Sequence, residues 1–396
     1  MFKHAFKLIW NRKKRNLLLM SEILFSFLVL FLVASIAVSG FLNYIQPLGF
    51  SYDNVWIVYP GWHSTTEDDK DPNIRNILIQ MKQEMESHRE IEAVSWATGN
   101  IPYSGSTWST GLKWNGITTN ARVSMTDDGF ADVLDMKIIK GRWFNEEDNA
   151  QSMDPIVITR DLDELLFDGQ NSIGQKYTED DHEYIVVGVS EIFRHHGELD
   201  KSHPGFFIRT PLPDTTTDLP SQVLIRVTDD ADVRFEKLLT ERLSSIGGNM
   251  KVSIQSMEDR RVSVLKDNLL AVGVVGIIAG FLVFNVALGL FGILWYSINR
   301  RRGEIGLRRA VGAGQKHISR QILYEAGVLA TVGIAIGLVI AVQAPVFKID
   351  DVISVSEYLL GMVLSAALIY TIVLICAIYP SILASRIQPA EALHDE

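Results

Sequence analysis

Four long apolar runs constrain this 396-residue chain more than any other feature of its sequence. A helix needs about 20 apolar residues to cross roughly 30 Å of hydrocarbon, and each run meets that length. The average composition, 47% hydrophobic and 21% charged, would suit an ordinary soluble chain and hides this segregation. The sequence therefore predicts four transmembrane helices, at residues 17–42, 268–298, 322–347 and 358–380.

Lysine and arginine are concentrated in two of the segments that flank these runs. One group precedes the first run and the other stands between the second and third: Lys3, Lys7, Arg12, Lys13, Lys14 and Arg15, then Arg300, Arg301, Arg302, Arg308, Arg309, Lys316 and Arg320. The short segment 348–357 contains one basic residue, Lys348. Since such residues favour the cytoplasmic side, we expect both termini and residues 299–321 in the cytoplasm. Residues 43–267 and 348–357 then lie on the outer side.

The N-terminal segment, residues 1–16, places Phe2, Phe6, Ile9 and Trp10 at helical spacing among basic residues. This pattern predicts an amphipathic helix lying on the inner leaflet, and a plain charged anchor is compatible with it. The apolar run that follows is too long for a signal peptide and lacks a clear cleavage site. We interpret it as an uncleaved first helix.

The outer segment, residues 43–267, is strongly acidic, with 38 Asp and Glu against 22 Lys and Arg and a net charge of −16. Nucleic-acid binding requires a basic surface, so this class of partner is excluded. The single cysteine, Cys376, lies in the fourth apolar run. The outer segment therefore has no disulfide, but its length is sufficient to bury a core of its own.

Two strand–helix–strand patterns frame the outer segment, at residues 52–97 and 221–257. Two such units can pair into one four-stranded sheet backed by two helices, a ferredoxin-like arrangement. Residues 98–220 between them predict an inserted β-rich subdomain, and residues 258–267 a short stalk. We thus expect an α-helical membrane protein whose large α/β extracytoplasmic domain, with ferredoxin-like βαβ halves, lies between the first and second transmembrane helices.

Motifs for catalysis are absent from the sequence. It contains no G-x-x-x-x-G-K-[ST], no H-E-x-x-H, no G-x-S-x-G and no cysteine pair. We predict no catalytic residue, no nucleotide site and no metal site in this chain. One histidine-rich group lacks a recognised ligand spacing, and we interpret it as a surface loop: His195, His196, Glu198 and His203.

Small and ionisable residues mark the apolar runs. Glu22 and Glu325 lie near the expected cytoplasmic ends, where each is either a functional candidate or a side chain that reaches the basic inner surface. Glycines separated by four positions favour close helix packing, and they occur in the second and third runs: Gly276 with Gly280, and Gly333 with Gly337.

The segment 299–321 reads "NRRRGEIGLRRAVGAGQKHISRQ". It resembles the cytoplasmic loop of ABC transporter permeases of the MacB/FtsX type, whose pattern is R-x-E-I-G-[IL]-R-[RK]-A-[IVL]-G-A. A simple positive anchor would not need this order of residue types. The positions that carry the match are Arg302, Glu304, Ile305, Gly306, Leu307, Arg308, Arg309, Ala310, Gly312 and Ala313.

Other segments share the resemblance. "GRWF" within residues 127–148, "NSIGQKY" followed by "EYIVVGV", and the ending "SRIQPAEALHDE" are similar to elements of the same family. Ser172 stands where that family usually has proline, and His394 where it has arginine. The likeness therefore extends over almost the entire chain.

The resemblance implies a permease subunit of a bacterial inner (cytoplasmic) membrane, of a Gram-negative cell, with residues 43–267 periplasmic. Its expected partners are a separate cytoplasmic ABC ATPase, which would bind the ATP and magnesium, a second permease subunit in a homo- or heterodimer, and membrane lipids. A periplasmic adaptor or hydrolase is a further candidate. Against the ATPase, we expect Ile305, Leu307 and Val311 to form an apolar contact. Arg308 and Arg309 would meet carboxylates, and the nearby glycines would permit a tight bend.

Two functions fit this architecture. In the first, ATP-driven movement of the outer domain, or mechanotransmission, drives export or extraction of a drug, peptide or lipoprotein. In the second, the same movement transports nothing and activates a periplasmic cell-wall hydrolase. The large two-part outer domain favours export. An ATP-independent receptor would leave the ordered pattern of residues 302–313 unexplained.

Overall fold

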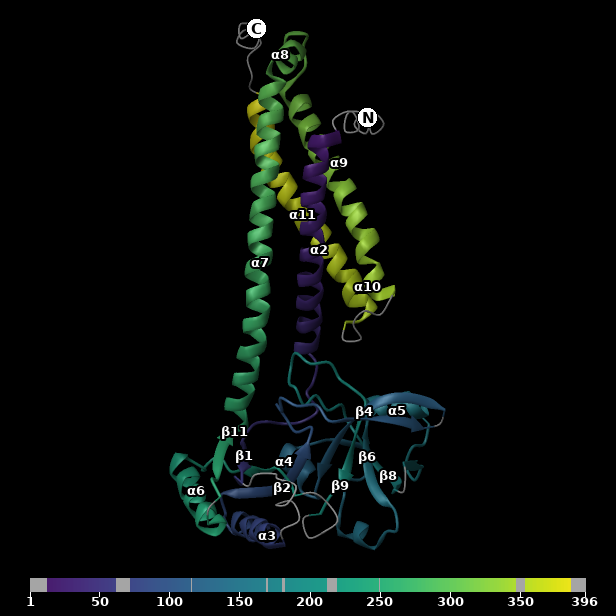
Figure 1. Cartoon of the computed structure of the whole chain (residues 1–396), viewed down its shortest axis with the longest axis vertical. Coiled ribbons are helices and arrows are strands. Elements are labelled where there is room, and N and C mark those ends of the chain that lie inside the picture. Colours follow the sequence, from purple (N-terminus) through teal and green to yellow (C-terminus); the bar gives the residue numbers. More distant parts are fainter. Residues whose placement is uncertain are drawn as a thin grey trace. The chain divides into compact units, whose positions relative to one another are not determined.

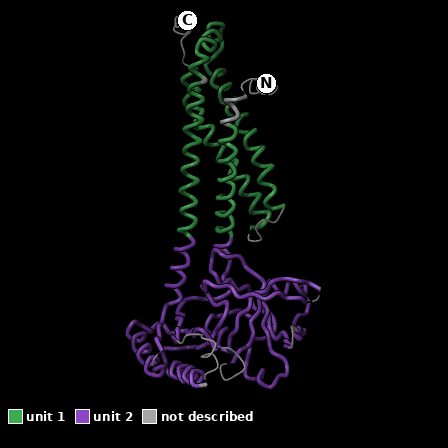
Figure 2. The backbone as a smooth tube through the Cα atoms, in the orientation of Figure 1, with its two compact units in different colours: residues 1–42, 269–396 green, residues 43–268 purple. Residues whose placement is uncertain are grey.

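The computed structural model (Figure 1) describes residues 13–61, 72–114, 116–168, 170–179, 182–211, 219–248, 250–346 and 353–385. Figure 2 shows its two compact units, a helical unit (residues 1–42 and 269–396) and an α/β unit (residues 43–268). The amphipathic helix predicted at residues 1–16 and the tail at 381–396 fall largely outside the described residues.

The helical unit is built from helices of very different length. They are α2 (Lys13–Tyr44), α7 (Met257–Arg300), α8 (Arg302–Ala310), α9 (Gln315–Ala341), α10 (Gln343–Val346) and α11 (Val355–Ser385). Four of them, α2, α7, α9 and α11, are long and apolar enough to cross a membrane. This confirms the predicted four-helix architecture.

Two helix boundaries differ from the sequence expectation. The 44 residues of α7 run without a break, so the predicted stalk at 258–267 and the second apolar run belong to one helix. Helix α9 begins at Gln315, before the predicted start at residue 322. The segment 299–321 therefore contains all of α8 and the first turns of α9.

Glycines of α9 bring α2 close. A Cβ atom at Gly333 would lie 2.8 Å from Ile23 Cγ2, and one at Gly337 would overlap the ring of Phe27. Both Ile23 and Phe27 are fully buried, so α2 fills the surface that these glycines leave open. The glycine pair of α7 is different, because nothing in the described residues lies within 4 Å of a Cβ built at Gly276 or Gly280.

The α/β unit contains one sheet. Its strands are β1 (Val55–Tyr59), β2 (Ile91–Gly99), β3 (Ser109–Trp114), β4 (Ile117–Thr126), β5 (Ile138–Gly141), β6 (Asp154–Thr159), β7 (Lys176–Glu179), β8 (His182–Ser190), β9 (Gly205–Arg209), β10 (Gln222–Val227) and β11 (Ser253–Ser256). They follow the order β11-β1-β10-β2-β4-β9-β6-β8-β5, with β3 beside β4 and β7 beside β8. Its longer helices are α3 (Pro72–Glu86), α5 (Arg160–Phe167) and α6 (Val233–Gly247), and α4 (Phe130–Leu134) is a short one.

The two predicted βαβ halves interleave as a ferredoxin-like unit. The strands β11, β1, β10 and β2 are antiparallel neighbours, so each half supplies alternate strands. Leu78 and Met81 of α3 and Leu239 of α6 are buried against this sheet in one core. Asp232 caps α6 by accepting hydrogen bonds from two backbone amides in its first turn. The ferredoxin-like prediction is confirmed.

The β-rich insert continues the same sheet. Residues 97–99 of β2 pair with residues 124–126 of β4, and β4 then pairs in parallel with β9. The sequence predicted an inserted subdomain without this continuity. A second core lies over the insert and includes Trp114, Leu162 and Phe206.

Candidate functional site

Helix α8 is a short amphipathic element between two long helices. Arg301 precedes it in a non-helical conformation, and Val311 ends it. Gly312 follows with φ of +102°, a left-handed conformation that only glycine adopts without strain. Gly314 then occupies the N-cap position of α9. The expectation that glycine permits a tight bend is thus met at Gly312, whereas Gly306 lies buried inside α8.

The inner face of α8 packs against α7 and α9. Ile305 is buried in the core of the helical unit, where the residues around it include Leu294, Ile298, Ile318 and Ile322. Ile305 is therefore unavailable for the partner contact that the sequence suggested. It instead anchors α8 to its own chain.

A network of polar side chains also connects α8 to α9. Glu304 accepts a hydrogen bond from Arg308 at 2.6 Å, and Arg308 also donates to Gln321 of α9 at 3.0 Å. Gln321 donates to Glu325 at 3.2 Å, and Arg301 donates to the same carboxylate at 2.9 Å. We call these five residues the α8 network. Arg308, expected to meet a partner's carboxylates, pairs within its own chain.

The outer face of α8 is where large apolar side chains meet solvent. Leu307 is 55% exposed and Val311 is 83% exposed. Arg302, Ala310 and Gly312 are also exposed, whereas Arg309 and Ala313 are partly buried. Burying an exposed leucine gains about 1.5–3 kcal/mol, so this face is suited to a partner surface. The predicted coupling residues thus divide into an exposed outer face and an inner face that packs on the rest of the helical unit.

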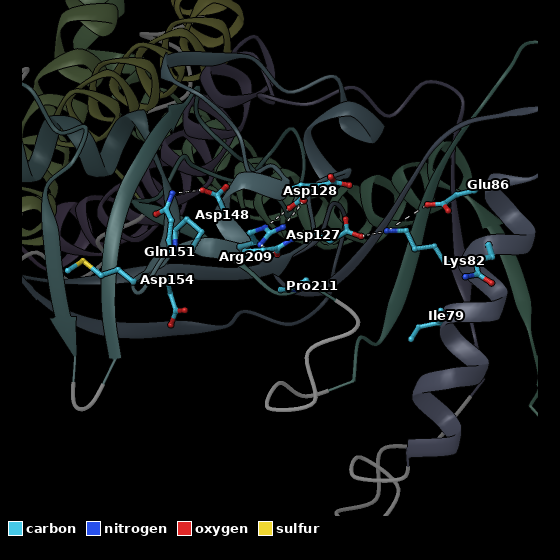
Figure 3. A pocket seen from close by; sticks show the side chains of 15 residues that line it. Ile79, Lys82, Glu86, Asp127, Asp128, Asp148, Gln151, Asp154, Arg209 and Pro211 are labelled. Atoms are coloured by element: carbon cyan, nitrogen blue, oxygen red, sulfur yellow. Dashed lines mark hydrogen bonds and ion pairs between the residues drawn. The ribbon is translucent and has the colours of Figure 1, made fainter.

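A polar groove opens in the α/β unit. Its volume is about 780 Å³, and it lies between α3 and the inserted strands (Figure 3). Lys82 pairs with Asp127 at 2.7 Å, and Arg209 holds Asp128 through two hydrogen bonds of 2.6 and 2.8 Å. The groove has more carboxylates than cations, since Glu86, Glu146 and Asp154 also line it.

The buried carboxylates of this groove are committed to the fold. Asp127 also accepts from Ser95 at 2.7 Å, and Asp148 receives two hydrogen bonds from Arg142. Burial alone would raise the pKa of Asp148, but hydrogen bonds from Arg142 and the Asn145 backbone lower it. Asp148 therefore remains ionised, and both carboxylates are paired. They shape the groove without forming an acid–base pair for catalysis.

The predicted surface loop with the histidines lies only partly at the surface, because His195 and Glu198 are buried while His196 and His203 are half-buried. Arg194 and His195 are 0% exposed. Burial, together with neighbouring His196 and Arg122, lowers the pKa of His195 to about 3. The reason is tertiary: Arg194 and Asp200 find partners from distant parts of the chain, which allows a polar segment to leave the surface.

His195, His196 and Asp200 place one ligand atom each within 4.8 Å of one another. His195 Nδ1 and Asp200 are already engaged, because Arg122 contacts the first at 3.0 Å and donates to the second at 2.8 Å, whereas His195 Nε2 has no hydrogen-bond partner. Both nitrogens of His196 have partners as well. A cation here would face the Arg122 guanidinium, so the donor set does not fit a metal.

Family models match both units of the chain. Residues 18–240 match the MacB-like periplasmic core domain, and residues 276–389 match the FtsX-like permease C-terminal domain. An α/β domain inserted between the first two of four membrane-type helices defines a multi-pass permease. The chain belongs to the MacB/FtsX-type ABC transporter permeases.

Curated relatives show the same likeness at low identity. The macrolide export ATP-binding/permease protein MacB of Wolinella succinogenes is 24% identical over 381 residues, which are 94% of this chain and 56% of the relative. The uncharacterized ABC transporter permease YknZ of Bacillus subtilis is 25% identical over 285 residues, 70% of this chain and 71% of YknZ. The chain spans about half the length of the MacB relative.

One solved structure aligns with part of the chain. The crystal structure of the periplasmic region of MacB from Actinobacillus actinomycetemcomitans aligns with 56% of this chain and 97% of that chain. The sequence identity is 19% and the TM-score is 0.39.

Proposed function

We propose that this chain is the membrane permease subunit of an ABC transporter that drives export or extraction of a drug, peptide or lipoprotein. It would couple ATP hydrolysis by a separate cytoplasmic ATPase, which binds ATP and magnesium, to movement of its α/β unit. Membership of the permease family supports the transporter part. The names of relatives that export macrolides and pyoverdine support the direction of transport.

The observation that carries the coupling is the two-sided structure of α8. Leu307 and Val311 face outward, while Ile305 and the α8 network fix the helix to α7 and α9. A force applied by a partner to the outer face would therefore reach two membrane-type helices. A flexible loop would absorb such a force instead.

The proposed orientation places α8 in the cytoplasm and the α/β unit in the periplasm of a bacterial inner membrane. It rests on the basic residues around α8 and before the first apolar run. A second permease subunit, identical or different, would cover part of α7. Most of the apolar part of α7 is not covered by the rest of the chain, since only 11% of it is buried. Leu270, Ile277 and Phe281 are exposed there.

The test is to extract the native complex in mild detergent and identify its partners by mass spectrometry. We expect an ABC ATPase in the parent complex and its loss in the variant Leu307→Asp with Val311→Asp. Leu238→Asp is the matched control, because Leu238 is an exposed leucine of α6 in the other unit. An ATPase absent from the parent complex, or one retained in the double variant, would contradict the proposal. A cell-wall hydrolase in place of transport components would favour the signalling function.

A further inference from the structure

Residues 192–200 form a buried connection between β8 and β9. We call them the clamp segment. Arg194 and His195 are fully buried, and Glu198 is nearly so. Burying an arginine and a glutamate is unfavourable unless both are paired and hydrogen-bonded, so their partners indicate what the segment holds together.

The clamp segment first binds the stretch that follows α2. The Arg194 guanidinium donates to the carbonyl oxygens of Gln46 and Pro47 at 3.0 and 3.3 Å, and its backbone amide donates to Leu48 at 3.1 Å. Asn43 reaches back to the Leu199 carbonyl at 3.3 Å. The chain leaving α2 is thus tied to the clamp segment at four points.

The clamp segment also binds the first turns of α7. The Arg261 guanidinium donates to the Glu198 carboxylate and lies 4.5 Å from the centre of the Tyr52 ring. Burial would lower the pKa of Arg261, but the hydrogen bond and charge of Glu198 raise it, so this guanidinium stays charged. The neighbouring Arg260 donates to the Tyr103 carbonyl at 2.9 Å.

A third set of contacts ties the clamp segment to the sheet. Asp200 pairs with Arg122 of β4 at 2.8 Å, and Tyr103 donates its backbone amide to the His195 carbonyl at 2.5 Å. Gly197 adopts φ of +93°, and a Cβ there would lie 2.7 Å from the Tyr103 ring. The clamp segment therefore joins the connections of two membrane-type helices to one strand.

The network has an alternative arrangement available. Arg261 also contacts Glu258, three residues earlier on α7, at 3.1 Å, and Glu258 is exposed. Among the described residues, Glu198 Oε2 and His195 Nε2 are buried without a hydrogen-bond partner. Both atoms retain hydrogen-bonding capacity that the present arrangement leaves unused. Arg261 can keep Glu258 while it releases Glu198.

We propose that residues 192–200 are a mechanical clamp that holds the stretch after α2, the first turns of α7 and strand β4 in one arrangement. It opens when Arg261 releases Glu198 and keeps Glu258. Arg261 and Glu198 are its positioning residues. The use of this opening to transmit ATP-driven movement rests on the proposed function, whereas the clamp itself does not.

The test uses the full-length chain in lipid nanodiscs, with nitroxide labels at Ile45→Cys and Lys266→Cys in a Cys376→Ala background. Both labelled positions are exposed and lie next to the two clamped segments. Pulsed electron spin resonance should give one narrow distance distribution for the parent. Arg261→Met and Glu198→Gln should each lose that narrow distribution. The double variant should be no broader than Arg261→Met, because both changes break one bridge.

Lys237→Met is the matched control, since Lys237 forms an exposed pair with Glu241 on α6. It should leave the distribution unchanged. If Arg261→Met does not fold, Arg261→Lys keeps the charge without the planar fork and gives the same comparison. A narrow, parent-like distribution in the Arg261 and Glu198 variants would overturn the clamp.

A second measurement separates the clamp from the proposed function. In complex with the co-purified ATPase, addition of ATP should change the parent distance, and Arg261→Met should retain ATP hydrolysis while losing this change. An Arg261→Met complex with the parent's ATP-dependent change would overturn the clamp as a transmission element. If no ATPase associates with the parent, the proposed function fails, and the label distances without ATP still decide the clamp.

Discussion

Arginine–glutamate pairs occur in both functional regions, but their surroundings differ. In α8, the side chains of Arg308 and Glu304 are 49% and 50% exposed. In the clamp, those of Arg261 and Glu198 are 17% and 8% exposed. Exposed pairs contribute little because water screens them, whereas breaking a buried pair leaves a charge without a partner. The same type of ion pair therefore contributes little to the stability of the exposed helix α8, whereas in the clamp it holds chain segments together.

The largest effect is expected where burial is deepest. Glu198→Ala should destabilise the α/β unit by about 1.5–3 kcal/mol, because it removes a charged hydrogen bond and leaves the Arg261 guanidinium only the exposed Glu258. Hydrogen-exchange mass spectrometry of the full chain measures this as lost protection in the peptides of the α/β unit. Glu90→Ala is the control, since it removes the partner of Arg89, whose side chain is 93% exposed. If both variants lose the same hydrogen-exchange protection, buried and exposed pairs do not differ in their contribution to stability.

Acid should weaken the clamp region through His195. Its pKa is about 3 in the folded chain, against about 6.5 when unfolded. Between these values the unfolded state binds the extra proton, so stability falls as pH drops from about 6.5 toward 3. The expected loss is about 1.4 kcal/mol at pH 5.5.

Unfolding measured by denaturant titration at pH 7.5 and 5.5 tests this dependence. Substitution of His195 by Gln should flatten it, and substitution of the exposed His182 by Gln should not. A dependence that His195→Gln leaves unaltered would assign the acid sensitivity to other groups.

An intermediate effect is expected for the Arg301–Glu325 pair. Its side chains are 18% and 25% exposed, between the two extremes. Glu325→Gln should destabilise the helical unit by about 1.5 kcal/mol, the contribution of one charged hydrogen bond. Thermal unfolding in detergent, followed by hydrogen exchange in α8 and α9, measures it. If Glu325→Gln loses as little stability as a variant of the exposed α8 pair, burial does not determine how much such pairs contribute.

The smallest effect is expected for Glu304→Gln. An exposed pair four residues apart on a helix contributes about 0.3–0.5 kcal/mol. The variant should unfold within a degree or so of the parent, as is typical for such small free energies. A large loss of stability would mean that the α8 network is worth more than its exposed pairs suggest.

Local patterns predicted the elements, and distant partners decided what those elements do. The helix and strand periodicities indicated the four apolar helices and both βαβ halves, because these signals lie within a few neighbouring residues. The four-residue spacing of Glu304 and Arg308 could have predicted their pairing, since it places them on one helix face. Their contact with Gln321 and Glu325 required the fold of α8 onto α9.

The clamp had no local signal. Arg194 bonds to a carbonyl 148 positions away, and Glu198 pairs with an arginine 63 positions away. A segment rich in histidine, glycine and acids is typical of a surface loop, and only tertiary partners make it a buried one. The pairing of β2 with β4 was missed for a related reason, since the sequence does not show whether a strand of the insert joins the sheet of the βαβ halves or forms a separate one.

Because α7 is one unbroken helix, the direction in which a side chain of its first turns points depends on the number of residues that follow it. Each residue of an α-helix advances about 1.5 Å and turns about 100°. Inserting one residue between Arg261 and the apolar stretch would rotate the guanidinium by more than a quarter turn relative to the face formed by Leu270 and Ile277. An insertion of seven residues, close to two full turns, would nearly restore that angle. Insertions of one and of seven residues therefore differ mainly in the angle that they introduce, although both lengthen α7. Comparing the two would show whether the direction of Arg261 or the length of the helix matters more.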